Sequence, residues 1–282
     1  MEVIEILDWK LAAFADEAAG DLAGQIAAMK RNGIGGLEIR FVDGQNIAKV
    51  SCDKAKEIRD RLAAEGLHVW SIGSPTGKIK LQDDFAPHLE EFKHQLELAN
   101  IMGAAHYRLF SFYGADDSDG AFNEVCERMQ ALLQATEGSG VVICHENEKD
   151  IFGDTDDRCV KLLSTFPALR AIFDPANFLQ CGVEILPAWE KLAPYVEYLH
   201  IKDCNKNGEV VPPGMGEGQL PALLAAYGKQ GGRVLTLEPH LNEFIGLDQL
   251  ENSGSASRSA YSYASADEAF DAAVTALKLI LP

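Results

Sequence analysis

Short strand-like segments alternate with longer helix-like segments along the chain, and this alternation constrains the fold more than any other feature. The strand-like segments are short apolar runs, whereas the helix-like segments carry apolar residues at helical spacing and often end at a glycine. The pattern predicts strands at residues 11–15, 36–40, 67–73, 106–112, 141–146, 169–174, 196–203 and 233–238. It predicts helices at residues 21–33, 54–66, 85–103, 121–138, 156–166, 183–193, 220–231 and 266–281.

Repetition of the same pair of elements favours a closed barrel. The strand–helix pairs run on with no break in composition, which predicts a single domain over residues 1–282 and a parallel (β/α)8 barrel. A doubly wound open sheet is the alternative, but no GxGxxG motif follows the first strand. Of the 282 residues, 47% are hydrophobic, so the chain can bury a core of this size.

The negative net charge limits which partners the chain can bind, and its cysteines indicate the cellular compartment. A formal net charge of −18 argues against a nucleic-acid partner and against anionic membrane surfaces, because both would repel the chain. The six cysteines form no CxxC pair, which is typical of reduced, mostly buried cysteines. The first ten residues do not resemble a signal peptide, and no apolar stretch is long enough to span a membrane. We therefore predict a cytoplasmic protein.

Side chains that can bind a metal follow one another at the ends of the last four strands. These residues are Glu146, Asp174, His200 and Glu238. Each alone has an ordinary explanation, as a helix cap, a turn residue or a buried histidine. At the carboxyl ends of barrel strands they would share one mouth and repel one another without a cation. Three carboxylates and one imidazole favour a single divalent ion, with Mn²⁺ the first choice, then Mg²⁺ or Co²⁺, and Zn²⁺ as a further option.

Several motifs resemble, in order and in strand placement, those of the sugar phosphate isomerase/epimerase superfamily, whose fold is a xylose isomerase-like TIM barrel. They are HENE, FDPANF, LHIKD, PPGMGEG and LEPHL, with an early DE and GLEIR, and they extend from Asp16 to the last helix. In ketose 3-epimerases of this superfamily a Glu-Asp-His-Glu set holds the metal. The resemblance therefore implies Glu146, Asp174, His200 and Glu238 as ligands, and it implies Glu146 and Glu238 as the acid/base pair.

The resemblance implies a metal-dependent isomerase or epimerase acting on a sugar or a sugar phosphate. A cation next to the sugar carbonyl would stabilise an enediolate while one glutamate removes a proton and the other returns one. A lyase of the same fold, acting on a keto-inositol (an inosose dehydratase-like enzyme) or on a keto-glycoside, is the alternative, since the same enediolate can expel a leaving group. Relatives with this barrel often form dimers or tetramers, and nothing in the sequence fixes the number of subunits.

Two further functions are weaker candidates. An apurinic-site endonuclease shares this barrel, but the resemblance implies a histidine-rich site with three metals. The chain has only seven histidines and carries a net charge of −18, which disfavours that activity. A barrel that binds a sugar or a metal without turnover is the remaining candidate, and the pair of glutamates argues against it.

Other polar residues are expected to contact the substrate. Arg40 and Arg108 stand at strand ends, where they would bind an anionic group or neutralise the acidic mouth. Lys78, in GSPTGKIK, would meet a hydroxyl or a phosphate, unless it belongs to an ordinary turn built on a proline and a glycine. Lys202 would polarise a substrate oxygen, with a solvated charge as the alternative.

Two candidate substrate contacts depart from the pattern of the epimerases. Many epimerases carry a histidine where Asn177 stands, and an amide can hydrogen-bond a hydroxyl but cannot shuttle a proton at neutral pH. Asp203 lies where epimerases carry a glutamate that orients the substrate or a ligand.

His145 precedes Glu146, so strand alternation turns it away from the barrel interior, towards a packing role. The long connection at 239–265 is expected to be a lid, a subunit-contact arm or a mobile loop.

Overall fold

The sheet closes where β1 (Lys10–Ala13), the first strand, pairs in parallel with β12 (Val234–Leu237), the last one. The structure is a computed structural model that describes residues 8–244 and 259–282. The remaining strands of the closed barrel are β2 (Gly36–Ile39), β5 (His68–Gly73), β6 (His106–Leu109), β7 (Val142–Glu146), β8 (Arg170–Phe173) and β9 (Val196–Ile201). Every pairing in the barrel is parallel, which confirms the (β/α)8 prediction.

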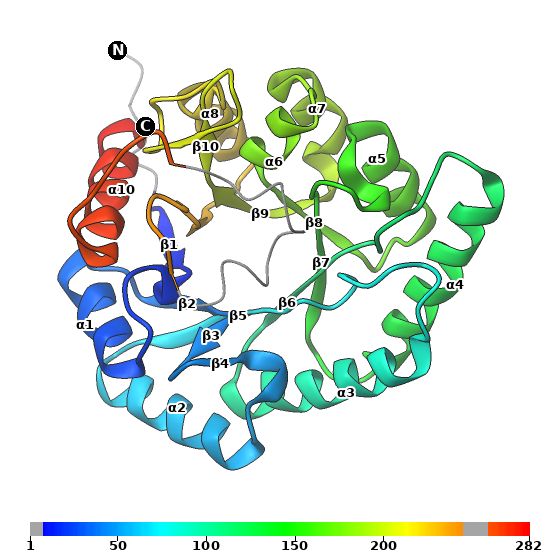
Figure 1. Cartoon of the computed structure of the whole chain (residues 1–282), viewed down its shortest axis with the longest axis horizontal. Helices are drawn as coiled ribbons and strands as arrows, with labels where there is room; N and C mark the ends of the chain where they lie inside the picture. The colour runs from blue at the N-terminus through cyan, green and yellow to red at the C-terminus, as the bar shows by residue number, and fades with distance from the viewer. Residues whose placement is uncertain (1–7, 245–258) are drawn as a thin grey trace.

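Helices surround the barrel on its outside (Figure 1). They are α1 (Leu22–Asn32), α2 (Cys52–Ala64), α3 (Phe85–Met102), α4 (Asp119–Ala135), α5 (Asp156–Thr165), α6 (Pro175–Gln180), α7 (Ile185–Leu192), α8 (Leu220–Lys229) and α10 (Ala266–Ile280). No helix within the described residues is both long and apolar enough to cross a membrane.

Helix ends follow signals that can be read in the sequence. Asp21 caps α1 by accepting a hydrogen bond from the backbone N–H of Gly24, and Ser51 caps α2 in the same way through Lys54. The same helix α1 ends at Gly33, which has a φ of 65°, a left-handed conformation that costs glycine little. These signals explain why the predicted and observed helices differ mostly by one or two residues at their ends.

Several elements differ from the prediction, among them the expected strand at 106–112, which ends at Leu109. The expected strand at 196–203 ends at Ile201, and Asp203 begins a separate hairpin of β10 (Asp203–Cys204) and β11 (Val210–Val211). A second small hairpin, β3 (Phe41–Val42) with β4 (Gln45–Asn46), follows β2. The short helix α6 directly after β8 was not predicted, because six residues carry too little periodicity. Of the long connection at 239–265, residues 245–258 lie outside the described part of the chain.

The barrel interior changes from apolar to charged along the strands. Cys144, Ile172 and Tyr198 form a small buried cluster inside it. Since alternate residues of a strand face the same side, Glu146, Asp174 and His200, each two positions further on, face inward as well. The six cysteines all lie within the described residues, and none forms a disulfide there. The apolar layer therefore supports a charged layer at the carboxyl ends of the strands.

Candidate active site and metal centre

Four side chains with metal-binding atoms converge at the carboxyl end of the barrel. Glu146, Asp174, His200 and Glu238 each place one such atom within 4.8 Å of the others. At most 3% of any of these residues is exposed. Glu146 ends β7, Asp174 follows β8, His200 lies within β9 and Glu238 follows β12. Four neighbouring strands thus deliver the predicted ligand set to one buried point.

Asp174 combines a structural and a chemical role. Its Oδ1 atom caps α6 by accepting a hydrogen bond of 2.9 Å from the Asn177 backbone N–H. Its Oδ2 atom is buried and pairs with the ammonium group of Lys202 at 2.9 Å. Burial and the nearby carboxylates Glu146 and Glu238 raise the pKa of Asp174, against the opposing effect of Lys202. The helix cap therefore leaves one oxygen available at the centre of the cluster.

His200 is held between carboxylates on both sides of its ring. Its Nδ1 atom lies 2.9 Å from Glu146 Oε1 and 3.2 Å from Glu238 Oε2. Its Nε2 atom lies 3.2 Å from Glu38 Oε2. Burial alone would lower the pKa of His200, but Glu146 and Glu38 raise it well above its ordinary value. Glu38 belongs to the GLEIR motif, but no role was assigned to it from the sequence, although its inward position on β2 was the available signal.

The donor set fits a divalent cation. Glu238 Oε2 and Asp174 Oδ2 are buried carboxylate oxygens that face the cluster, where His200 and Lys202 are their ion-pair partners. A buried carboxylate needs such a positive charge beside it, and a divalent cation would supply one. Three carboxylates with one imidazole suit Mn²⁺, Mg²⁺, Co²⁺ or Zn²⁺. The described residues therefore have the composition and spacing to hold one metal ion at this point.

Arg40 and Arg108 neutralise the acidic mouth, which is the second of the two roles expected for them. Arg40 pairs with Asp16 at 2.8 Å, with Glu17 at 3.1 Å and with Glu238 at 2.9 Å. Arg108 donates a hydrogen bond of 3.0 Å to Glu146 and lies 3.6 Å from Glu238. Both guanidinium groups also lie over aromatic rings, including Phe14. The arginines thus hold the two glutamates in place, and Arg40 is bound on three sides.

A narrow pocket opens onto this cluster. Lys78 and Glu148, which pair at 3.0 Å, form part of its wall. Lys202 lies deeper, 2.9 Å from Asp174 and 3.6 Å from Glu238. Although burial opposes the change, Lys78 and Lys202 lower the pKa of Glu148 to about 2. Glu148 was not singled out from the sequence, where it follows Glu146 by two positions at the end of the strand. The residues that line the pocket are Arg40, Lys78, Arg108, Glu146, Glu148, Lys202, Glu238 and His240.

Asn177 contacts the cluster from α6. Its Nδ2 atom donates to Asn147 O at 3.0 Å and reaches Glu146 Oε1 at 3.4 Å. Asn147 in turn exchanges two hydrogen bonds of 2.9 Å with the backbone of Asp174. The two amides therefore tie the ends of β7 and β8 together and orient Glu146.

Asp203 lies apart from the pocket and organises a loop instead. Its carboxylate accepts backbone hydrogen bonds of 2.9–3.0 Å from Gly214, Gly216 and Gly218. A Cβ atom on Gly216 would lie 2.4 Å from Asp203 Oδ1. Because both carboxylate oxygens are engaged in this way, the expected substrate contact of Asp203 is replaced by a structural role. The glycines of PPGMGEG are explained by this close approach.

His145 takes the position that strand alternation predicts, and a second histidine, His240, lies at the pocket. The His145 ring points away from the interior and its Nε2 atom lies 2.9 Å from Ser111 Oγ. Burial lowers the pKa of His145 to about 3, so the ring is neutral. His240 lies beside the pocket, with its Nε2 atom 3.5 Å from Glu238 Oε1.

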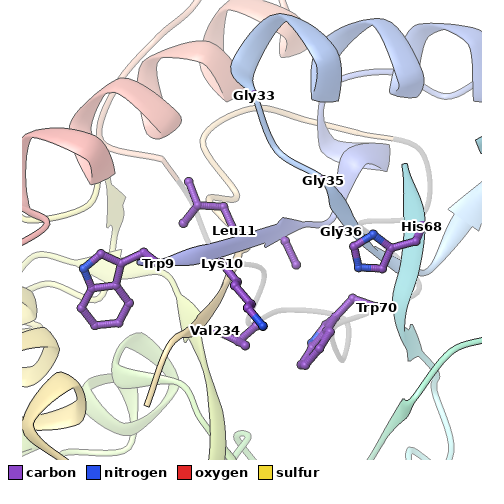
Figure 2. A pocket seen from close by; sticks show the side chains of 10 residues that line it. Trp9, Lys10, Leu11, Gly33, Gly35, Gly36, His68, Trp70 and Val234 are labelled. Carbon is purple, nitrogen blue, oxygen red and sulfur yellow. The ribbon is translucent and has the colours of Figure 1, made fainter. Parts of the chain in front are cut away.

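A larger cavity lies at the opposite end of the barrel, and it does not carry this chemistry. It measures about 450 Å³ and is lined by Trp9, Lys10, Trp70 and His68 among others (Figure 2). The residues that line it include no carboxylate. In such barrels the amino-terminal end of the strands serves stability. The smaller pocket at the carboxyl end is therefore the candidate active site.

Comparison with known proteins agrees with this geometry. A sequence model of the family described as xylose isomerase-like TIM barrel matches residues 26–258. No curated protein sequence matches the chain significantly. A D-allulose 3-epimerase from Methylomonas sp., solved in complex with D-allulose, superposes with a TM-score of 0.76 at 17% identity over 97% of this chain and 96% of that one.

Two further solved structures show the range of activities on this fold. The probable 3-DHS dehydratase AsbF from Bacillus anthracis has a TM-score of 0.73 at 16% identity over 96% of this chain and 99% of its own. The IolI protein, solved with a bound zinc atom, has a TM-score of 0.73 at 16% identity over 96% of this chain and 98% of its own. At these identities the likeness establishes the fold, and the activity has to be argued from the site.

Proposed function

This chain belongs to the xylose isomerase-like TIM barrel family, and we propose that it is a divalent-metal-dependent isomerase or epimerase of a sugar or a sugar phosphate. The observation that carries the proposal is the buried pair Glu146 and Glu238. The two glutamates come from β7 and β12, which are separated by two strands, and yet both contact His200 Nδ1 and Arg108 Nη1. They therefore approach one point from different sides of the barrel.

Two carboxylates on different sides of a substrate suit a transfer of protons at carbon. When bound by Glu146, Asp174, His200 and Glu238, a divalent cation supplies stabilisation of negative charge on a carbonyl oxygen. One glutamate removes the proton from the carbon next to the carbonyl, and the substrate becomes an enediolate. The other glutamate returns a proton, to the opposite face in an epimerase or to the neighbouring carbon in an isomerase.

The remaining pocket residues position the substrate. Lys78 and Lys202 bring ammonium groups to the pocket, where they would bind hydroxyl, carbonyl or phosphate oxygens. Arg108 keeps the two glutamates oriented, because it contacts both of them. Asn177 orients Glu146 through a hydrogen bond. Its amide neither gains nor loses a proton at neutral pH, so the glutamates carry out the proton transfer.

Metal analysis of the purified protein is the first test of this proposal. We expect about one divalent ion per chain at this site in the wild type and none there in a Glu146→Gln/Glu238→Gln double variant. Absence of any metal after reconstitution of the wild type would remove the four-ligand site. A matched control is Glu137→Gln, an exposed carboxylate outside the barrel mouth, which should leave the metal content unchanged.

A screen of the metal-loaded protein then identifies the chemistry. Ketoses, their phosphates and keto-inositols are incubated in D₂O and followed by NMR for exchange of a C–H proton. The mass of the product separates isomerisation, which conserves it, from dehydration by a lyase, which loses water. Exchange with conserved mass supports the proposal, loss of water assigns the chain to the lyases, and absence of exchange with every substrate class contradicts both.

A further inference from the structure

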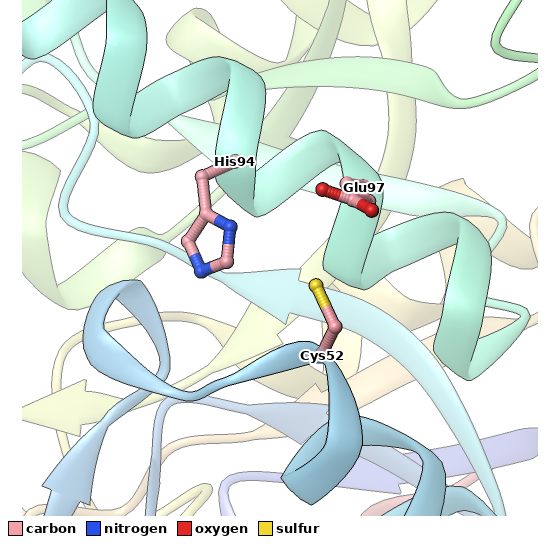
Figure 3. Close-up of side chains that lie close together, drawn as sticks. All are labelled: Cys52, His94 and Glu97. Carbon is pink, nitrogen blue, oxygen red and sulfur yellow. The ribbon is translucent and has the colours of Figure 1, made fainter.

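A second group of side chains that bind metals lies on the outer wall of the barrel, where α2 packs against α3 (Figure 3). Cys52 is the first residue of α2, and His94 and Glu97 are neighbours one turn apart on α3. One ligand-capable atom from each lies within 4.8 Å of the other two. Cys52 and His94 are half-buried and Glu97 is exposed, so the group is open to solvent ions.

The orientation of His94 is fixed from outside the group. Its Nε2 atom lies 2.9 Å from the backbone oxygen of Val50. Because a carbonyl oxygen can only accept, Nε2 carries the proton and Nδ1 keeps its lone pair. Figure 3 shows this second ring nitrogen on the side of Cys52 and Glu97. Histidines that bind metals commonly donate their other N–H to a backbone carbonyl in this way, which sets the tautomer and the ring orientation.

We propose that Cys52, His94 and Glu97 form a zinc site that fastens the start of α2 to α3. Thiolate, imidazole and carboxylate are the three ligand types that Zn²⁺ takes in proteins, and a water molecule completes four-coordination. The thiolate separates this site from the barrel mouth, whose nitrogen and oxygen ligands suit harder ions. The site is independent of the proposed function, since no residue is shared.

Binding requires only a small movement of the side chains. Tetrahedral Zn²⁺ with bonds of about 2.0–2.3 Å places its ligands roughly 3.3–3.8 Å apart. The three ligand atoms lie within 4.8 Å of one another, so they have to approach by at most about 1.0–1.5 Å, which side-chain rotation of partly exposed residues permits. Binding also displaces the thiol proton to solvent, because the thiolate is the ligand.

Cobalt substitution tests the proposal directly, because a thiolate bound to Co²⁺ gives a charge-transfer absorption in the near ultraviolet. The full-length protein is titrated with Co²⁺ and then with Zn²⁺. We expect the absorption in the wild type, in the Glu146→Gln/Glu238→Gln variant and in Cys126→Ser, which removes another half-buried cysteine. We expect none in Cys52→Ser, and an affinity at least about tenfold weaker in Glu97→Gln. An absorption that persists in Cys52→Ser, or is absent from the wild type, would overturn the site.

A second measurement needs no variant at Cys52 and so does not depend on the folding of one. Zinc should protect Cys52 from alkylation in the wild type, as read by mass spectrometry of the peptide, and Cys126 in the same sample serves as the internal control. In Glu97→Gln the zinc concentration needed for protection should rise at least about tenfold. Alkylation of Cys52 at the same rate with and without zinc would refute the proposal, while the barrel-mouth site is judged separately by its own metal content.

Discussion

Lys202 places its ammonium nitrogen 2.9 Å from Asp174 Oδ2, one of the oxygens expected to bind the metal. Both side chains are buried. Burial alone would lower the pKa of Lys202, but Asp174 and Glu238 raise it well above its ordinary value, so the ammonium group stays charged. Lys202 therefore acts as an internal counterion for the same carboxylates that a divalent ion would neutralise, and the two cations compete.

Replacement of Lys202 should destabilise the metal-free protein and strengthen its binding of a divalent ion. In Lys202→Met the buried carboxylates lose a counterion, and we expect the metal-free protein to lose about 3–5 kcal/mol of unfolding free energy. Divalent ions should bind this variant at least about tenfold more tightly, since a like charge is gone. Thermal unfolding with and without Mn²⁺ measures both effects. Lys191→Met, which removes an exposed ion-paired lysine, is the control and should cost at most about 1 kcal/mol. Unchanged metal affinity in Lys202→Met would contradict the competition.

The proposed acid/base pair predicts a kinetic result. Glu146→Gln and Glu238→Gln should each lower the turnover rate by about 10²–10⁴, because an amide cannot accept the proton from carbon. Some of the loss will come from weaker metal binding, so each variant is assayed at saturating metal. Measurement of C–H exchange in D₂O reports the proton transfer itself, and Glu137→Gln provides a carboxylate control outside the site. Full exchange in both glutamine variants would rule out the assigned roles.

The turn that carries Lys78 should be sensitive to acid. His88 Nε2 accepts a hydrogen bond of 2.8 Å from the Gly77 backbone N–H, which requires an unprotonated nitrogen. Burial lowers the pKa of His88 below its ordinary value of 6.5. The unfolded chain therefore binds a proton that the folded protein does not, so stability is complete above about pH 6.5 and falls below it, by at most about 1.4 kcal/mol per pH unit.

Urea unfolding at pH 8 and pH 5.5 checks this sign. The wild type should lose more stability between the two pH values than His88→Gln, whose amide does not titrate. His68→Gln removes an exposed histidine and should behave as the wild type does. An equal pH dependence in the wild type and His88→Gln would contradict a link between His88 protonation and stability.

The loop anchored by Asp203 predicts a difference between two glycines. Gly216→Ala would bring a Cβ atom within 2.4 Å of both Asp203 Oδ1 and Cys204 O, and we expect it to cost about 1–3 kcal/mol of stability. Gly120→Ala, in α4, meets no atom closer than 3.9 Å and should be neutral or stabilising by about 0.5–1 kcal/mol. Denaturant unfolding of the two variants compares them. A Gly216→Ala protein as stable as Gly120→Ala would mean that the loop adapts freely.

Much of the fold and the cluster could be predicted because both depend on local patterns. The residues next to Glu146 in the sequence show a strand, and strand alternation predicts that its side chain points into the barrel. Its position at the end of that strand predicts that it lies at the mouth. The partners of Glu38 and Arg40 could not be read in this way. Glu38 meets His200 across 162 positions of sequence, and Arg40 meets Glu238 across 198. No local pattern records such partners.

Asp203 illustrates the opposite difficulty. Its sequence neighbours predicted a strand that continues past Ile201, and the resemblance to the epimerases predicted a side chain at the substrate. The chain instead turns into the β10–β11 hairpin, and the backbone N–H groups of three glycines capture the carboxylate. Because backbone N–H groups bind the Asp203 carboxylate, the only trace of this contact in the sequence is the group of glycines. Glycines are common in several kinds of turn, so they do not identify this contact.

Because the first and last strands of the barrel pair with each other, the candidate site can form only late in the synthesis of the chain. Glu17 accepts a hydrogen bond from the backbone of His240, 223 positions later, and Arg40 donates one to Glu238, 198 positions later. During synthesis these early charged side chains emerge long before their partners, and they stay hydrated until β12 has been made. A nascent chain therefore cannot assemble a working centre from its first half, and contacts of such long range make folding slow. The candidate site can therefore be completed only after β12 has been made.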